Sequence, residues 1–258
     1  MATGQASRDR ELAAALPVRV LETPEEFETC VALQSRTWGF HDRDLVPRRM
    51  FVVARKIGGA VLGAYDGERL AGFALTLPAH RPGQTFWHSH MLAVEPEYRD
   101  RGLGRRLKLA QREQALALGF DLIEWTFDPL EMKNAYFNLE TLGAIARHYH
   151  PNLYGLTTSA LQGGLPTDRL TAEWWLRSPR VAALAAAAEP PPRPPVAAEI
   201  AVPREIQDWK QAHDARAEAL QAHNRTAFLR HFGEGMIAFG CARRPEASAF
   251  LLGYGEPA

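Results

Sequence analysis

A glycine-containing turn between an apolar strand and a helix is the feature that most constrains how this chain can fold. Between Val94 and Leu107 the sequence reads V-E-P-E-Y-R-D-R-G-L-G-R-R-L, with the pattern R-x-x-G-x-G from Arg99 to Gly104. Pro96 stops the strand, and apolar residues recur at helical spacing after the turn. Glycine permits a sharp turn and a close approach of backbone amides, and a helix N-terminus attracts anions. The segment is therefore predicted to bind a pyrophosphate.

Two common phosphate-binding loops do not fit this sequence. A Walker loop requires G-x-x-x-x-G-K-[ST], which is absent, and a dinucleotide-binding loop requires a third glycine at the position of Leu107. Without its flanking residues, the R-x-x-G-x-G pattern has an alternative interpretation, a tight strand-to-helix turn whose basic side chains are solvated. The flanking residues favour a more specific interpretation.

With its flanks, the segment resembles the signature of the GNAT superfamily of N-acetyltransferases, a strand of the form L-x-V-x-P followed by [QR]-x-x-G-x-[GA] and a helix. The matching positions are Leu92, Val94, Pro96, Arg99, Gly102 and Gly104. The resemblance implies that the loop binds the pyrophosphate of coenzyme A and that the preceding strand pairs through its backbone with the pantetheine arm. The cosubstrate is then acetyl-CoA or another acyl-CoA. The residues assigned to it are Leu92, Ala93, Val94, Arg99, Arg101, Gly102, Leu103, Gly104 and Arg105.

The region upstream of the turn supports the same fold. Strands are predicted at 18–21, 60–64, 69–77 and 85–94, and a capping box beginning at Thr23 predicts a helix after the first of them. With the helix that follows the turn and a strand at 122–127, the order is β, α, β, β, β, α, β. The predicted fold class is α+β, with a GNAT-type mixed, mostly antiparallel central sheet flanked by helices.

Two histidines directly precede the signature, in the run His88-Ser89-His90-Met91-Leu92-Ala93-Val94. Residues two apart in a strand point to one face, so the two imidazoles are predicted to lie together. The H-x-H-x-L-A-V pattern resembles the arylalkylamine N-acetyltransferases, in which paired histidines help to deprotonate the amine. A histidine suits this task because its reference pKa is about 6.5.

Other roles for the histidine pair are open. One alternative is that both histidines are structural residues whose side chains only form hydrogen bonds within the strand region. A zinc site shared with His148 and His150 is a further alternative. No carboxylate or cysteine has ligand spacing beside either pair, so no metal ion is predicted.

The sequence departs from the family pattern N-x-x-A-x-x-x-Y-x-x-x-G, in which the tyrosine is the proton donor for the leaving thiolate. Aligning the chain on Ala135 and Gly143 places Leu139 where the tyrosine is expected. Tyr136, three residues earlier, is the candidate general acid. Tyr149, Tyr154 and solvent are the alternatives, and a half-buried aromatic residue is the structural interpretation of Tyr136.

The same alignment places Met132 where the family has an asparagine. Asn134 and Asn138 are the candidates for the missing contact to the cofactor. Asp128, at the end of the strand 122–127, either binds the ammonium group of the acceptor or caps the following helix, and capping is the preferred interpretation. Glu124 is an alternative base if it faces the cleft.

Three segments are predicted along the chain. Residues 1–180 form the GNAT-like acyl-CoA-binding domain, with 1–16 flexible, and residues 181–197 form an Ala/Pro-rich linker whose prolines cannot continue a helix. Residues 198–258 form a C-terminal α/β extension of order β-α-β-β, with its helix at 206–232. This extension is small for an independent domain, so we expect it to pack against the first domain or a second subunit, which leaves a homodimer open.

Bulk properties exclude some partners. The 30 basic and 30 acidic side chains cancel, so there is no general attraction to nucleic acid or to an anionic membrane. The longest alanine-rich apolar run, 181–188, is too short to span a bilayer. Cys30 and Cys241 lie far apart in a chain without an apolar signal segment near Met1, which predicts a cytoplasmic protein without a disulfide framework.

Together these features predict an enzyme, an acetyl-CoA-dependent N-acetyltransferase. It transfers an acetyl or other acyl group from acyl-CoA to an amine acceptor, expected to be a small molecule, by direct attack. His88, His90 and Tyr136 are its candidate catalytic residues. Two other functions stay open: a coenzyme A-binding or regulatory module with little or no turnover, and an interaction protein that acts through its C-terminal extension.

Overall fold

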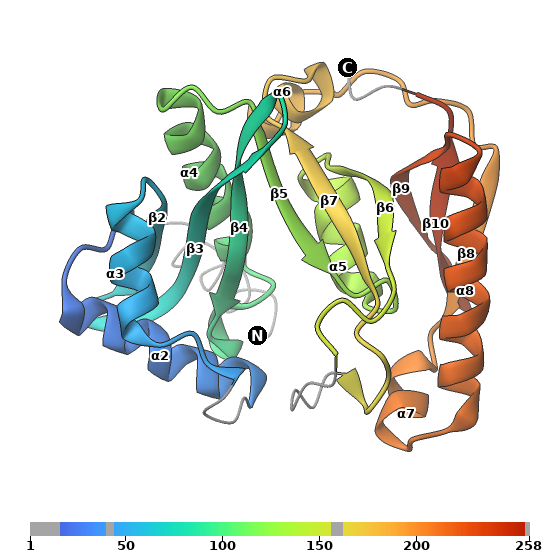
Figure 1. Ribbon diagram of the computed structural model, residues 1–258, viewed down its shortest axis with the longest axis horizontal. Coiled ribbons are helices and arrows are strands. Elements are labelled where there is room, and N and C mark those ends of the chain that lie inside the picture. The colour runs from blue at the N-terminus through green and yellow to red at the C-terminus, as the bar shows by residue number, and fades with distance from the viewer. Residues whose placement is uncertain (1–15, 40–43, 156–161, 256–258) are drawn as a thin grey trace, which may run out of the picture. The chain divides into compact units, whose positions relative to one another are not determined.

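The computed structural model describes residues 16–39, 44–155 and 162–255 (Figure 1). Internal contacts divide the chain into two compact units, Met1–Ile123 and Glu124–Ala258, and each unit is described by itself. The segment predicted to be flexible, 1–16, lies outside the described residues except for Leu16. The predicted domain boundaries at the linker stay a prediction.

The first unit is an antiparallel sheet with helices on both faces. Its strands follow one another in the order β1-β2-β3-β4, and each pairs antiparallel with the next. The strands are β1 (Val18–Val20), β2 (Ala60–Asp66), β3 (Arg69–Arg81) and β4 (Gln84–Val94). The helices are α2 (Pro24–Trp38), α3 (Arg48–Lys56) and α4 (Leu103–Ala117), and a short 3-10 turn, η2 (Pro96–Tyr98), precedes α4.

Alternation along the strands explains why this sheet is covered on both faces. Val61 and Phe73 point into a core with the apolar side chains of α2 and α3. Leu62 and Ala74, their direct neighbours along the strands, point into a second core that contains Leu107 of α4. The helix α2 begins at the predicted capping box, in which the Thr23 and Glu26 side chains each accept a backbone hydrogen bond.

The second unit has the strand order β5-β7-β6-β9-β10-β8, and its described pairings are antiparallel. The strands are β5 (Leu122–Phe127, which begins at the end of the first unit), β6 (Ile145–His150), β7 (Arg169–Trp175), β8 (Ala198–Pro203), β9 (Ile237–Arg243) and β10 (Ala247–Gly253). The helices are α5 (Met132–Tyr136), the π-helix η3 (Phe137–Thr141), α6 (Pro179–Ala185), α7 (Ile206–Gln211) and α8 (Ala215–Gly233). Aromatic contacts of Phe228 in α8 with Tyr149 and Phe250 join this long helix to β6 and β10.

The predicted fold class is confirmed, and the details differ in two places. Helix α3 is absent from the predicted elements; it is short, and only two of its side chains, those of Phe51 and Ala54, are buried. The single helix expected at 206–232 is two helices, α7 and α8, separated by a turn in which His213 has φ of +51°. Within the described ranges, no helix combines the length and apolarity needed to cross a bilayer.

Candidate active site

The glycine turn forms the N-terminus of α4. Gly102 is the N-cap residue, with φ of +84° and ψ of −4°, a left-handed conformation that favours glycine. The first helical hydrogen bond runs from the Arg106 amide to the Gly102 carbonyl, at 3.1 Å. The amides of residues 103–105 therefore point out of the helix end, where an anion is stabilised. A Cβ added at Gly102 meets no atom within 4 Å, so a ligand can approach the turn closely.

Two side chains hold this turn against the sheet. The Arg99 guanidinium donates from Nε to the Val94 carbonyl at 2.9 Å. The Glu95 carboxylate is buried at the end of β4 and accepts a 2.9 Å hydrogen bond from Arg36 of α2, with Arg69 of β3 at 3.7 Å. Arg36 is 59 residues away from Glu95 in sequence, so no local pattern could have indicated this anchor.

Strand β4 has a β-bulge at the second histidine. The pairing with β3 skips His90, because the register shifts between Leu75 and Thr76. The ring centroids of His88 and His90 nevertheless lie 6.0 Å apart. The prediction that the two imidazoles lie together is confirmed, although the bulge interrupts the simple alternation on which it was based.

The surroundings of the two histidines lower their pKa values. The pKa of half-buried His88 falls to about 4, because burial removes water from the imidazole and the charges of His90 and Lys108 add repulsion. The pKa of His90 is lowered by loss of solvent around the ring, although part of the residue stays exposed. Both imidazoles are therefore neutral at pH 7, which is the form that accepts a proton.

A buried polar cluster adjoins the histidine strand inside the first unit. Lys108 of α4 is 2% exposed, and its Nζ donates to the Ser89 hydroxyl at 2.8 Å. The Gln111 amide donates to the same hydroxyl at 3.0 Å and to the hydroxyl of Thr76. Burial lowers the pKa of Lys108 well below its ordinary value. Sequence reasoning missed this cluster; its available signal was two polar residues, Lys108 and Gln111, three apart on the otherwise apolar face of a helix.

The segment after β5 contains a π-helical turn, in which the Leu142 amide bonds to the Phe137 carbonyl at 3.0 Å. A π turn adds one residue to the helical count, so counting along this segment does not predict which side chains face outward. Leu139, at the position aligned with the family's tyrosine, is completely buried. Tyr136 is half-buried, and the guanidinium carbon of Arg243 lies 3.6 Å from the centroid of its ring.

The two candidate asparagines have different surroundings. Asn134 is exposed on α5. Asn138 is 2% exposed, and its Oδ1 accepts a 3.2 Å hydrogen bond from the Trp125 indole. Its Nδ2 has no hydrogen-bond partner among the residues that the structure describes. A buried donor of this kind is costly unless a ligand or water satisfies it.

Asp128 already has two partners within the second unit. Its Oδ1 accepts the Leu130 amide at 2.8 Å, a turn contact two residues along the chain. Helix α5 begins later, with Glu131 as its N-cap residue, so Asp128 does not cap it. Its Oδ2 lies 3.2 Å from Nζ of Lys210, a residue of α7 that is 2% exposed. The same ammonium donates to Glu131 at 2.8 Å. Lys210, a residue of the C-terminal extension, is thus the ion-pair partner of Asp128, the carboxylate that was the alternative binding group for the ammonium of an acceptor.

The alternative proton donors are engaged in other contacts. The Tyr149 hydroxyl donates to Asp168 at 2.5 Å, and burial together with this carboxylate raises the pKa of Tyr149 well above its usual range. The exposed Tyr154 hydroxyl lies 2.8 Å from the Thr126 hydroxyl. Tyr149 is therefore a poor acid at neutral pH.

The second histidine pair makes polar contacts with neighbouring strand residues. His148 Nε2 lies 3.5 Å from the buried carboxylate of Glu173, and His150 Nε2 lies 2.9 Å from the Thr171 hydroxyl. Across residues 16–39, 44–155 and 162–255, no group of three or more histidine, cysteine or acidic side chains is arranged to hold a metal ion.

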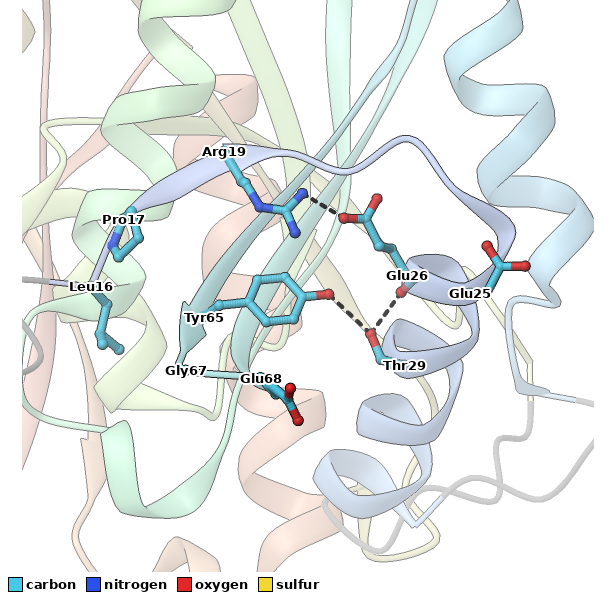
Figure 2. A pocket seen from close by; sticks show the side chains of 9 residues that line it. All are labelled: Leu16, Pro17, Arg19, Glu25, Glu26, Thr29, Tyr65, Gly67 and Glu68. Atoms are coloured by element: carbon cyan, nitrogen blue, oxygen red, sulfur yellow. Dashed lines mark hydrogen bonds and ion pairs between the residues drawn. The ribbon is translucent and has the colours of Figure 1, made fainter.

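A hollow of about 700 Å³ in the first unit contains none of the predicted site residues (Figure 2). Its polar groups face one another: Arg19 lies 2.5 Å from Glu26, and Thr29 donates to the Glu26 carbonyl at 2.7 Å. The Tyr65 hydroxyl points toward Thr29, at 3.5 Å. Its lining is formed by Leu16, Pro17, Arg19, Glu25, Glu26, Thr29, Tyr65, Gly67 and Glu68.

The comparison with protein families agrees with this geometry. Residues 21–137 match the family model described as the Acetyltransferase (GNAT) family. The match contains the glycine turn, both β4 histidines and helix α5. No curated protein sequence matches the chain.

Solved structures with the same fold share little sequence with the chain. A protein from Desulfovibrio desulfuricans described as an acetyltransferase of the GNAT family is 16% identical, with a TM-score of 0.51 over 63% of this chain and 99% of its own. Aminoglycoside 6'-acetyltransferase type Ii is 20% identical, with a TM-score of 0.51 over 62% and 97%. The yncA protein of Salmonella typhimurium, determined with its cofactor acetyl-CoA, is 14% identical, with a TM-score of 0.51 over 63% and 94%. These likenesses show the fold of GNAT acetyltransferases.

Proposed function

We propose that the chain is an N-acyltransferase that moves an acetyl or other acyl group from acyl-CoA to an amine. The observation that carries this proposal is the left-handed Gly102 at the N-terminus of α4, inside the segment that matches the GNAT acetyltransferase family. The solved protein yncA, which shares the fold, was determined with acetyl-CoA. Acetyl-CoA would supply the acyl group as a thioester.

The residues of the turn fit the pyrophosphate of coenzyme A. The amides of Leu103, Gly104 and Arg105 lie at the helix end, and the space around Gly102 is open. Arg99 and Arg101 add positive charge to the same turn. Strand β4 would align the pantetheine arm through the backbone of residues 92–94, where it carries the signature L-x-V.

His88 and His90 are the proposed proton acceptors. An alkylammonium must lose a proton before its nitrogen can attack an acyl carbon, and both imidazoles are in the neutral form at pH 7. Burial is the cause of the lowered pKa at His90, whereas the charges of His90 and Lys108 add to burial at His88. The likeness of the pair to arylalkylamine N-acetyltransferases belongs to this proposal.

Tyr136 is the proposed proton donor to the leaving thiolate. It is half-buried on α5, whereas Leu139 is buried and Tyr149 is bound to Asp168. In the same segment, the unsatisfied Nδ2 of Asn138 supports the assignment of this residue to the cofactor. Exposed Asn134 is the second assignment.

The acceptor is proposed to be a small-molecule amine. The cancelling charges of the chain give no reason to expect nucleic acid or membrane lipid as a partner. A cytoplasmic location and a homodimer are part of the same hypothesis. The domain limits at residues 180 and 198 are also proposed.

Release of free thiol from acetyl-CoA, measured against a panel of amines, tests the activity. Turnover with at least one amine is expected, and the double variant His88→Gln/His90→Gln should lose about a hundredfold or more in kcat/KM, a typical general-base contribution. His80→Gln, at an exposed position of β3, is the matched control and should retain activity. Binding of coenzyme A without turnover would instead support the regulatory module. If calorimetry detects no binding of coenzyme A, the proposed acyl-CoA-dependent function is contradicted.

A further inference from the structure

The helical segment 132–141 depends on contacts with the rest of the second unit. It consists of the five residues of α5 and the five residues of the π turn η3. Helices this short are not stable by themselves, because nucleation costs more than so few hydrogen bonds return. The positions of its side chains are therefore set by the residues that pack against it.

One set of these contacts is made through Glu140. The Cys241 amide of β9 donates to Glu140 Oε1 at 2.7 Å. Arg193, in the proline-rich linker, donates to the same oxygen at 2.7 Å through Nη1 and to Oε2 through Nη2. The linker and β9 therefore both bind the π turn, although they follow it by more than 50 residues in sequence.

Gly240 of β9 lies where the side chains of Arg193 and Glu140 come close to the strand. A Cβ at Gly240 would lie 2.7 Å from Arg193 Nη1 and 3.1 Å from Glu140 Oε1. A larger residue would require the Arg193 guanidinium, at the end of a flexible side chain, to shift. The absence of a side chain at Gly240 thus leaves room for this contact.

A second contact, made by Arg243 at the end of β9, is directed at Tyr136. Its guanidinium carbon lies 3.6 Å from the centroid of the tyrosine ring, which is within the range of a cation–π contact. A planar group stacked on the ring face fixes the plane of the ring and thus limits the directions in which the hydroxyl can point. The neighbouring Arg244 is bound elsewhere, with its guanidinium at 2.6 and 2.7 Å from the two oxygens of Glu199.

We propose that Arg243 is a positioning residue for Tyr136, so that the C-terminal extension is a working part of the acyl-transfer machinery. This inference rests on the proposed function, in which Tyr136 donates the proton. It assigns a role to β9, which lies outside the segment that matches the family model. Removal of Arg243 leaves the tyrosine in place but lets its ring rotate, so catalysis slows while substrate binding is unchanged.

The test compares steady-state kinetics of wild type, Arg243→Met, Arg243→Lys and the matched control Arg244→Met. We expect Arg243→Met to lower kcat about threefold to fivefold, the usual strength of an exposed cation–π contact, with KM for acetyl-CoA and for the amine unchanged. Arg243→Lys keeps the cation and should restore at least half of kcat. Arg244→Met should keep the wild-type kcat, because its ion pair with Glu199 is exposed and does not involve Tyr136.

A double-mutant cycle separates positioning from general destabilisation. In a Tyr136→Phe background, Arg243→Met should have no further effect on kcat, since the hydroxyl that it positions is gone. Independent losses in the double variant, or equal losses in Arg243→Met and Arg244→Met, would overturn the inference. A wild-type kcat in Tyr136→Phe would instead overturn the proposed role of Tyr136, and with it the assignment of Arg243.

Discussion

The two units hold their candidate site residues by different means. In the first unit a short connection that contains η2 and the glycine turn joins β4 to α4, and Gly102 acts through its own backbone conformation. In the second unit Glu131 binds Lys210, 79 residues away, and Glu140 binds the amide of Cys241, 101 residues away. The backbone conformation of the turn is set at Gly102 itself, although the contact between Glu95 and Arg36 also holds the turn against the sheet. The segment in the second unit has a larger share of distant charged partners, so it should be more sensitive to their removal.

The largest effect is expected where the second unit depends on a buried cation. Lys210→Met leaves Asp128 and Glu131 without their ammonium partner, so the free energy of unfolding should fall by about 3–5 kcal/mol. Urea denaturation measures the change. The control Arg244→Met breaks an exposed ion pair and should cost about 1 kcal/mol or less. Equal losses in the two variants would contradict the distinction between buried and exposed charges.

In the first unit we expect a pH-dependent stability from His88. Its pKa is about 4 in the folded chain and about 6.5 when unfolded, so the unfolded state binds more protons between these values. The free energy of unfolding should therefore fall as the pH drops from 6.5 to 4, by up to about 3 kcal/mol. His88→Gln should flatten this part of the profile. An unchanged slope would show that other groups are responsible.

A smaller effect is expected at the glycine turn. Gly102→Ala places a side chain at φ of +84° and should cost about 1–2 kcal/mol of stability through backbone strain. Gly67, in the turn between β2 and β3, is a matched control because it has φ of +57° and, like Gly102, nothing within 4 Å of an added Cβ. Both variants should lose stability, but only Gly102→Ala should weaken coenzyme A binding measured by calorimetry. Equal affinities of the two variants for coenzyme A would show that the turn at Gly102 does not bind the cofactor.

The smallest predicted effect concerns the buried cluster next to β4. Repulsion from Lys108 is one cause of the lowered pKa of His88, so Lys108→Met should raise that pKa, by less than about one unit. Titration of the His88 ring followed by NMR measures the shift. Lys56→Met, at an exposed position of α3, should leave the pKa of His88 unchanged. A shift of the same size in both variants would mean that the effect is not specific to Lys108.

The elements of the first unit were largely predictable, because their signals are local. The capping box at Thr23 and the apolar runs of β2, β3 and β4 each lie within a few residues. The buried partners Glu95 and Arg36 were not predictable, since they are 59 residues apart. The clustering of the histidines was predicted correctly, but the bulge at His90 depends on the pairing of β4 with β3.

In the second unit, the candidate site segment contains a π turn that the sequence analysis did not predict. The alignment on Ala135 and Gly143 crosses the π turn η3, where one extra residue changes which side chains face the solvent. Leu139, inside the turn, is completely buried, whereas Asn134, which precedes the turn in α5, is exposed. No property of residues 132–141 alone indicates that Arg243 lies on Tyr136.

The sequence by itself determined the strand, glycine turn and helix of the first unit, because glycine conformation, helix capping and apolar periodicity act over a few residues. It also indicated candidate side chains for the proposed acyl transfer. Tertiary structure alone decided that the pKa of His88 is lowered, that Lys210 forms an ion pair with Asp128, and that a strand of the C-terminal extension contacts Tyr136. Burial and charge pairing depend on residues that are distant in the chain, and only folding brings them together.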